Sequence, residues 1–367
     1  MRKGYALLTS LLLVGACKDG PSAAPSTATS PEVPENATGT LADGAGEAAG
    51  SAPQHPAQTL SPRDGEGKFS SLRQLSFAGD ARRPTWLAEA GGLAFVARAD
   101  AKSCARLLRV DLEGRPLPPV RGDESVGLGG VTRWGQGLIA SLRPKDADCE
   151  TALRPWPRLD AAAELGGLGV DVPTGLDAVG FDGFPSASAD GRVLAWVSTR
   201  SGDPEIWIRR EGEMARRLTW SRGLDMAPSV SDDGQWVVWV ANRPRGAQAL
   251  AAWDEAWNDQ RVPALPTDLW ISRTDGTEMR RLTDFGAHLL SPQTRDGTTI
   301  WFTANIHDAR RKDFDVYRMR LGGVPERMTT GPGFDGHAVV DPTSRKLAFV
   351  SDRDADGPRL LVATLDD

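Results

Sequence analysis

Cysteine is scarce in this sequence, with three residues in 367, and the common catalytic and metal-binding motifs are missing. There is no CxxC pair and no Cys/His cluster with zinc spacing, which argues against structural zinc. There is also no G-x-S-x-G elbow, HExxH helix, glycine-rich phosphate loop or dinucleotide fingerprint. We therefore expect a protein without a cofactor, without a catalytic residue and without enzymatic activity.

The chain also lacks an excess of positive charge. It has 43 Lys and Arg against 49 Asp and Glu, a net charge of −6 at pH 7. Such a chain does not attract phosphate backbones over long range, so we expect no nucleic-acid partner. Charged residues make up only 25%, whereas 40 Gly, 26 Pro and 12 Trp are present. This composition argues against a helical bundle or coiled coil and favours short strands joined by many turns.

No apolar run near the N-terminus is long enough to cross a bilayer. The run Ala6–Val14 covers about nine residues, against the roughly 20 that a transmembrane helix needs. It follows a basic start and is followed by small residues, as in a secretory signal peptide, which we assign to residues 1–16. Val14-Gly15-Ala16-Cys17 resembles the bacterial lipobox, and this resemblance implies cleavage before Cys17 and a lipid on its sulfur. An ordinary secretory peptide is the alternative.

The resemblance to lipoproteins also implies a location. Lys18 stands where inner-membrane lipoproteins carry Asp, so we expect an outer-membrane lipoprotein in the cell envelope. Its body would face the periplasm, with surface exposure as the alternative. Residues 17–67 contain the lipidated Cys17 and a Pro-, Ala-, Ser- and Gly-rich segment with no aromatic side chain. Such a segment cannot bury enough apolar surface to fold, so we expect a disordered tether, roughly 40 Å long on average.

Residues 68–367 contain a sequence repeat. The segments FPSASADGRVLAWV (184–197) and APSVSDDGQWVVWV (227–240) share Pro-Ser, Asp-Gly and an apolar strand ending in Trp-Val. LSPQTRDGTTIWFT (290–303), HAVVDPTSRKLAFV (337–350) and RPTWLAEAGGLAFV (83–96) follow the same frame. Asp-Gly favours a tight turn between two strands, so each repeat is predicted to open with a hairpin.

Two further strands complete each predicted unit. A strand such as Glu205–Ile208 follows the hairpin, and a short Arg-Leu-Thr segment such as Arg217–Thr219 follows that strand. Four strands per unit of about 46 residues predict a six-bladed β-propeller. The weak second unit leaves five or seven blades as alternatives. Gln74-Leu75-Ser76 copies the outer-strand segment, so this N-terminal strand is predicted to complete the last blade and close the ring.

These repeats carry a family resemblance. Pro-Ser-x-Ser-x-Asp-Gly, Asp-Leu-Trp-Ile and Arg-Arg-Leu-Thr resemble the WD-like repeat of the TolB family of bacterial periplasmic proteins, over about residues 72–365. The resemblance implies a propeller that docks other proteins in the cell envelope. In TolB an α/β domain precedes the propeller, whereas this chain has Cys17 and the predicted tether there, which argues against a strict Tol role.

Several residues are candidates for local roles. Cys104 and Cys149 occupy equivalent places in neighbouring blades and form a predicted disulfide, with two buried thiols as the alternative. Asp352, Asp354 and Asp356 match the opening of a calcium loop, D-x-D-x-D-G. Ala363 stands where such a loop needs a bidentate Glu, so an Asp-rich turn is the favoured interpretation.

His and Trp residues give two more candidates. His288, His307 and His337 are scattered over the last two blades, and we expect them to be turn or packing residues. An insertion at about residues 246–266 has helix-like spacing and carries Trp253 and Trp257. The Trp pair could dock a partner, because Trp is enriched at interface hot spots, or could fold back onto the blade.

The predicted function is that of a non-catalytic, lipid-anchored interaction scaffold. We expect a monomer that is held to the membrane through Cys17 and binds an envelope protein whose identity the sequence does not reveal. Two other classes stay open: a propeller that binds a carbohydrate or small ligand, and a propeller lyase or hydrolase. Both would have their site in the central mouth of the ring.

Overall fold

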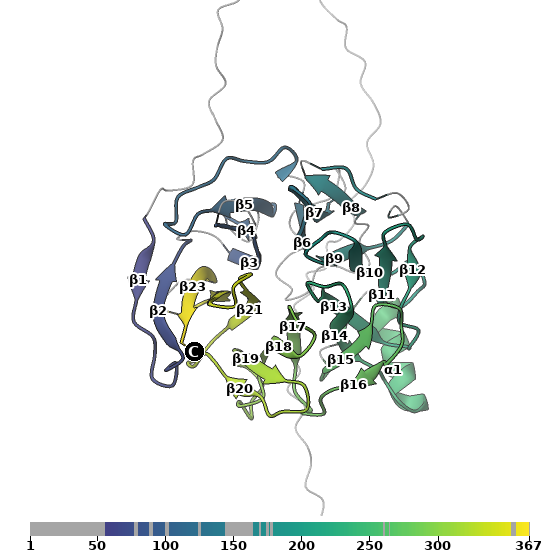
Figure 1. The fold of residues 1–367 in the computed structure, drawn as a ribbon. Coiled ribbons are helices and arrows are strands. Elements are labelled where there is room, and N and C mark those ends of the chain that lie inside the picture. The colour runs from purple at the N-terminus through teal and green to yellow at the C-terminus, as the bar shows by residue number, and fades with distance from the viewer. Residues whose placement is uncertain are drawn as a thin grey trace, which may run out of the picture. The chain divides into compact units, whose positions relative to one another are not determined.

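The computed structural model describes residues 56–367 except 77–79, 88–90, 100–102, 124–125, 144–163, 169, 174–175, 177–178, 260, 264, 354–356 and 367. The predicted signal peptide, Cys17 and most of the predicted tether lie outside this range. The described strands form six antiparallel sheets around one axis, a six-bladed propeller (Figure 1). This confirms the predicted fold class and settles the blade number at six.

Each sheet is a blade, numbered here in chain order. Blades 1 and 2 have three described strands each: β3 (Asp80–Trp86), β4 (Leu93–Arg98), β5 (Arg106–Val110); β6 (Val126–Trp134), β7 (Gly137–Leu142), β8 (Glu164–Leu168). Blades 3 and 4 have four: β9 (Asp182–Ala187), β10 (Val193–Ser198), β11 (Glu205–Arg210), β12 (Arg216–Arg217); β13 (Leu224–Val230), β14 (Trp236–Asn242), β15 (Asp268–Arg273), β16 (Arg280–Arg281). Blades 5 and 6 are β17 (Leu289–Thr294), β18 (Thr299–Ala304), β19 (Asp315–Arg320), β20 (Glu326–Arg327); β21 (Asp335–Val340), β22 (Lys346–Ser351), β23 (Arg359–Leu365), β2 (Phe69–Gln74), β1 (Gln58–Leu60).

The Ser-x-Asp-Gly motif builds the hairpin between the first two strands of a blade. In blade 4, the Ser231 hydroxyl donates to Asp233 Oδ1 at 2.6 Å and accepts the Trp236 amide at 2.9 Å. Asp233 Oδ1 also accepts the Gln235 amide at 3.0 Å. Gly234 adopts φ 68°, which glycine allows without steric cost. The predicted hairpins are therefore present, and their side chains hydrogen-bond the turn.

The second strand of each blade is the centre of the core. Both faces of such a strand are covered, because neighbouring blades pack against each side of the sheet. β10 and β22 are accordingly almost continuous apolar runs and do not alternate with polar residues. Trp196 and Trp239 are fully buried at equivalent places on β10 and β14. The repeated Trp-Val of the sequence thus fills the space between blades.

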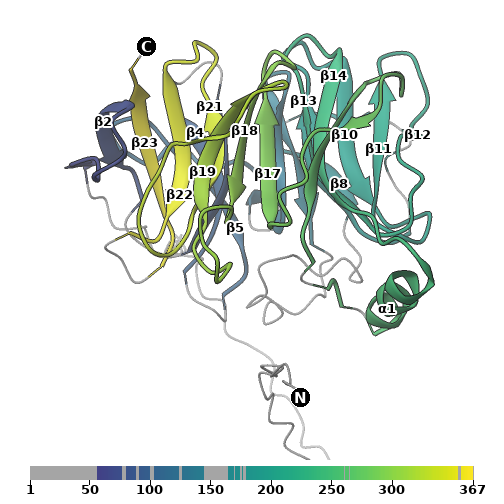
Figure 2. The same cartoon turned by 90° about the horizontal axis from the view of Figure 1, so that it is seen from below.

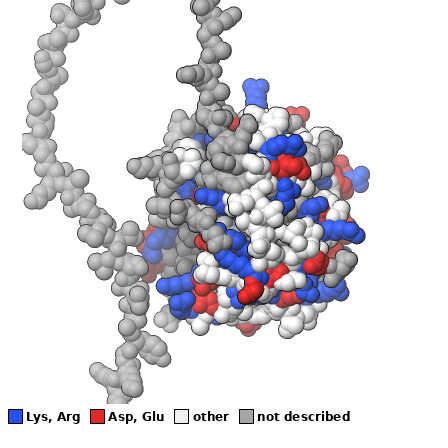
Figure 3. Space-filling view, turned by 90° about the vertical axis from the view of Figure 1, so that its left-hand side faces the viewer, with Lys and Arg blue, Asp and Glu red and all other residues white. Residues whose placement is uncertain are grey.

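The ring closes by pairing strands from distant parts of the chain. β2 pairs antiparallel with β23, and β1 adds a fifth strand outside β2. The predicted role of Gln74-Leu75-Ser76 is confirmed: Leu75 is buried, and the Ser76 hydroxyl accepts the Leu360 amide at 2.8 Å. On the described residues of the outer wall near these strands, basic and acidic side chains are interspersed (Figure 3).

The predicted tether boundary at residue 67 is wrong, because the folded domain begins earlier. β1 lies within the predicted tether, and the buried carboxylate of Glu66 forms an ion pair with Arg353. The composition of this segment does not reveal β1, because an edge strand can form with a single large apolar residue, here Leu60. The pairing to β2 supplies its backbone hydrogen bonds instead.

The two faces of the ring differ. In an antiparallel blade the first hairpin turns at one face, and the connection from second to third strand turns at the other. The predicted insertion contains α1 (Ala247–Asn258) between β14 and β15, so we call the face that carries it the helix face and the opposite one the hairpin face (Figure 2). Within the described residues, no helix has the length and apolar character required to span a membrane.

Candidate functional site

The innermost strands of the six blades, β3, β6, β9, β13, β17 and β21, surround the central channel (Figure 1). Each carries an irregularity in its pairing with the second strand. At this irregularity one residue adopts positive φ, and we call it the channel position of the blade. The channel positions of blades 1 to 6 are Arg83, Gly130, Phe184, Ala227, Ser291 and His337.

Positive φ at the channel position is a property of the architecture. Of the eight described non-glycine residues with positive φ, five are channel positions, with φ between 45° and 55°. This conformation costs an L-residue about 1–2 kcal/mol. A Pro follows the channel position in four blades, where its fixed φ supports the bend. The side chain at this position differs from blade to blade.

All six channel positions line a cavity of about 130 Å³ in the channel. The guanidinium of Arg83 lies over the ring of Phe184, 4.1 Å from its centroid. Ser291 Oγ and His337 Nδ1 are 2.7 Å apart, at hydrogen-bond distance. Arg83, Ser291 and His337 also line a second cavity of about 250 Å³. The channel thus has a polar side formed by blades 5, 6 and 1.

The charges around the channel hold His337 in its neutral form. Burial lowers the pKa of the His337 imidazole well below its ordinary value, and the positive charges of Arg83 and Arg82 lower it further. Burial, with repulsion from Arg82, likewise lowers the pKa of Arg83 to about 9, so this guanidinium stays charged at neutral pH. His337, which the sequence suggested to be a turn or packing residue, lines the channel and contacts Ser291 there.

Carboxylates at the start of the innermost strands form ion pairs inside their own blades. In four blades an Asp contacts an Arg 18 residues later in the chain, at 2.7–2.9 Å: Asp80–Arg98, Asp182–Arg200, Asp225–Arg243 and Asp335–Arg353. Burial raises the pKa of Asp335 to about 6 although Arg353 lowers it. These acids connect the first and second strands, so their observed role is structural.

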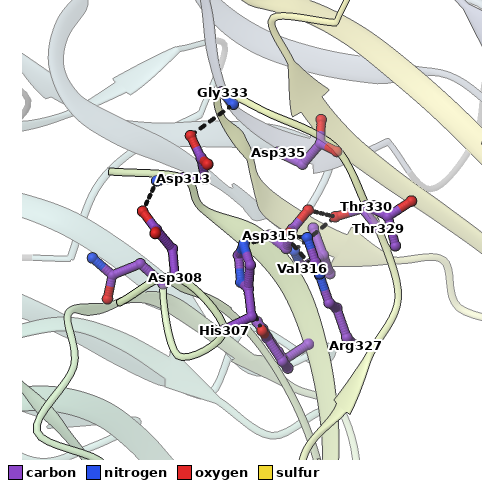
Figure 4. Close-up of polar contacts among 12 residues, drawn as sticks. His307, Asp308, Asp313, Asp315, Val316, Arg327, Thr329, Thr330, Gly333 and Asp335 are labelled. Carbon is purple, nitrogen blue, oxygen red and sulfur yellow. Dashed lines mark hydrogen bonds and ion pairs between the residues drawn. The ribbon is translucent and has the colours of Figure 1, made fainter. Parts of the chain in front are cut away.

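A second repeated network explains the Arg-Leu-Thr segments and their blade 5 copy, Arg327-Met328-Thr329 (Figure 4). In blade 5, the Thr329 hydroxyl donates to Asp315 Oδ1 and accepts the Val316 amide, both at 2.9 Å. Arg327 Nε donates to Asp315 Oδ2 at 2.8 Å, and His307 Nε2 lies 3.1 Å from the same oxygen. Burial and the charge of Arg327 lower the pKa of His307. His307 lies in a turn and packs against Tyr317, in line with the suggestion from the sequence, and it also hydrogen-bonds.

The equivalent network of blade 3 supports an exposed aromatic ring on the helix face. Glu205 accepts hydrogen bonds from Arg217 and Thr219. The guanidinium of Arg217 lies 4.5 Å from the ring centroid of Trp220. Trp220 is 73% exposed, the only exposed Trp in the described residues. The connection from β12 to β13 carries this ring, which places it on the same face as α1.

The Trp pair of the insertion is placed differently. Trp253 is 1% exposed, and its indole donates to Asp203 Oδ1 at 3.1 Å. The Trp257 ring stacks on it at 6.0 Å and is partly buried against the same core. This burial favours the second of the two interpretations from the sequence, in which both rings fold back onto the blade.

The remaining sequence candidates lie partly outside the described residues. Cys149 lies outside, so the Cys104–Cys149 disulfide stays a prediction. Asp354 and Asp356 lie outside as well, and Asp352 Oδ1 accepts the Phe334 amide at 2.8 Å. No cluster of three or more His, Cys, Asp or Glu that could share a metal occurs in the described parts of the chain. His288 is half-buried, and burial lowers its pKa.

The sequence matches no protein-family model and no curated protein. Solved structures are similar at low identity. A gluconolactonase from Xanthomonas campestris is 13% identical, with a TM-score of 0.50, over 88% of this chain and 99% of that one. A putative TolB from Agrobacterium tumefaciens is 16% identical, with a TM-score of 0.47, over 79% and 91%.

An oligogalacturonate lyase in complex with manganese is 12% identical, with a TM-score of 0.44, over 85% of this chain and 96% of that one. At these identities the similarity concerns the fold. Both enzymes and TolB occur among the similar propellers, so the role of this chain has to be argued from its own residues.

The sequence analysis missed the channel positions as a group, although a signal was present. The channel position directly precedes Pro in four repeats, as Arg83, Phe184, Ala227 and Ser291, and His337 begins the corresponding segment of blade 6. The residue type at the channel position varies, whereas the motifs around it are constant. Such variation indicates that the fold does not require one particular side chain there.

Proposed function

We propose that this chain is a non-catalytic binding module of the bacterial cell envelope, anchored by lipid on Cys17, and that it docks an envelope protein on the helix face around Trp220. The exposure of Trp220 is the observation that carries the proposal. A Trp side chain hides about 150 Å² or more when buried, which at about 25 cal/mol per Å² is about 4 kcal/mol. Leaving it in water forgoes that stabilisation unless a partner covers the ring.

The ring is also held in place before any partner arrives. Arg217 stacks on Trp220 and is bound in turn by the buried carboxylate of Glu205. An ordered ring loses less conformational entropy on binding than a mobile one. Trp and Arg are the side chains most enriched among interface hot spots. The pair therefore has the composition and the order expected of a docking anchor.

The docking surface can be tested by site-specific photo-crosslinking in intact cells. A photoreactive residue at position 221 should give a discrete adduct that disappears when Trp220→Ala is added. Met214 provides a matched control, because it is 89% exposed but lies on the β11–β12 turn at the hairpin face. Met214→Ala should leave the adduct unchanged. An adduct that survives Trp220→Ala, or no adduct at all, would overturn the proposal.

The anchor needs a separate test. Cys17→Ser should abolish incorporation of a labelled fatty acid and release the protein from the membrane fraction. Retention of the label by the Cys17→Ser protein would contradict lipidation at this residue. Binding of a small ligand is the alternative function, and the polar channel residues Arg83, Ser291 and His337 favour it.

A further inference from the structure

The channel positions divide the ring into two halves of different chemistry. Blades 5, 6 and 1, which are neighbours once the ring is closed, present Ser291, His337 and Arg83. Blades 2, 3 and 4 present a glycine, Phe184 and an alanine. Positive φ occurs at the channel position in both halves, so the chemical difference comes from the side chains. Polar groups on one side and an apolar wall on the other are the usual composition of a small-molecule site.

The polar half opens into the larger of the two cavities. The cavity of about 250 Å³ lies at the start of β3 and of β21, on the helix face, and is large enough for a ligand of about ten non-hydrogen atoms. Its other walls are mainly apolar and include Leu290, Phe334 and Val350. Phe334 also packs against the His337 ring, with 5.4 Å between centroids. A ligand would thus meet polar groups at one end and apolar surface along its body.

Arginine outnumbers acidic residues in the described lining of this cavity. Asp80 is the only carboxylate among the described lining residues, and both Arg82 and Arg98 donate to it. Arg83 adds a further cation, whose guanidinium is held over Phe184. Guanidinium groups bind carboxylates in a planar, bidentate geometry, and in a water-poor site such a bond is strong. Ser291 and His337 contribute a hydroxyl and an imidazole to the same lining.

We propose that the channel mouth bounded by Arg83, Ser291 and His337 binds a small organic carboxylate. The carboxylate lies against Arg83, a neighbouring hydroxyl or keto oxygen of the ligand bonds to Ser291 or His337, and the apolar body lies along Phe334 and Val350. The site is independent of the docking surface, because Trp220 is not among its lining residues. The carboxylate can come from a free metabolite or from the C-terminus of a protein segment that enters the channel.

Mandelate is a suitable probe, because it combines a carboxylate, an adjacent hydroxyl and a ring within the size of the cavity. Calorimetry and ligand-observed NMR on the propeller-containing chain should detect mandelate and show at least tenfold weaker binding of its neutral amide, mandelamide. Arg83→Gln should weaken mandelate binding at least tenfold. Arg133→Gln is the matched control, since Arg133 lies on β6 outside the cavity and donates to the Ala189 carbonyl. It should leave binding unchanged.

Ser291→Ala provides a second variant in case Arg83→Gln fails to fold, and it should weaken mandelate binding severalfold, because the hydroxyl of mandelate loses its partner. Equal binding of mandelate and mandelamide, or undiminished binding by a folded Arg83→Gln protein, would overturn the proposal. A peptide ending in Phe with a free carboxylate separates the two sources. Tighter binding of this peptide than of mandelate assigns the site to a protein terminus, and weaker binding assigns it to a free acid. Loss of photo-crosslinking at position 221 would not change any of these results.

Discussion

Glu66 and Arg353 are 287 residues apart in the chain, yet Arg353 donates two hydrogen bonds to the Glu66 carboxylate, at 2.8 and 3.0 Å. Both side chains are almost fully buried, and Arg353 also contacts Asp335 on β21. The pair joins the segment before β2 to the connection between β22 and β23. It therefore reinforces the closure of the ring next to the β2–β23 strand pairing.

Removing Glu66 should destabilise the propeller strongly. Glu66→Ala leaves part of the charge of Arg353 buried without its partner, and we expect a loss of about 3 kcal/mol in the free energy of unfolding. Urea denaturation measures this change. Glu326→Ala is the control, because Glu326 pairs with Arg318 and Lys68 at the surface and should cost less than about 1 kcal/mol. Equal losses in the two variants would contradict a special role for Glu66.

Glycine should be tolerated at a channel position but not at a regular strand position. Ala227 has φ 52°, whereas Ala195 is a paired residue of β10. Glycine in a strand costs about 0.5–1 kcal/mol, but at Ala227 this cost is offset by relief of about 1–2 kcal/mol of backbone strain. Thermal denaturation should show Ala195→Gly destabilised and Ala227→Gly unchanged or stabilised. The reverse order would mean that the channel conformation carries no strain.

Substitution of the exposed Trp220 and of the buried Trp253 should affect the free energy of unfolding differently. Trp253→Ala removes a buried ring and its hydrogen bond to Asp203, and should cost about 3–5 kcal/mol. Trp220→Ala removes a mostly exposed ring and should change stability by less than about 1 kcal/mol. Chemical denaturation of both proteins checks this. A large loss with Trp220→Ala would indicate a structural ring and weaken the docking proposal.

Stability should fall as the pH rises through neutrality, in part because of Glu205. Burial raises the pKa of this carboxyl to about 7, from an ordinary value of 4.5. Between these values the folded protein binds more protons than the unfolded chain, so the free energy of unfolding decreases with rising pH. Glu205→Gln should flatten the melting temperature between about pH 5 and pH 8. Glu278→Gln, at an exposed carboxyl, should keep the slope of the original protein.

The repeat in the sequence predicts most of the fold because its motifs are local. Asp-Gly sets a turn and Arg-Leu-Thr sets an outer strand, and each acts within one blade, as the hydrogen bonds of Ser231 and Thr329 show. The start of the domain is different. Glu66 is held by Arg353, which lies near the other end of the chain. No motif near Glu66 in the sequence predicts this ion pair.

The candidate site is harder to predict than the fold for a related reason. Arg83, Ser291 and His337 lie in three separate repeats and converge only because the ring brings blade 1 next to blade 6. In each repeat alone, the channel position is one variable position among many. The ion pairs with 18-residue spacing, by contrast, recur in four blades, and a search for that spacing in the repeat would have found them.

The pairing of β2 with β23 also sets a time order. A ribosome adds about 5–20 residues per second, so about 15–60 s pass between the synthesis of these two strands. During that interval β23 has not been synthesised, so β2 lacks the strand with which it pairs. The unpaired strand edges of the incomplete propeller can then pair with other chains. A polypeptide of this design benefits from a chaperone, or from an export route that carries it unfolded, until its last strand arrives.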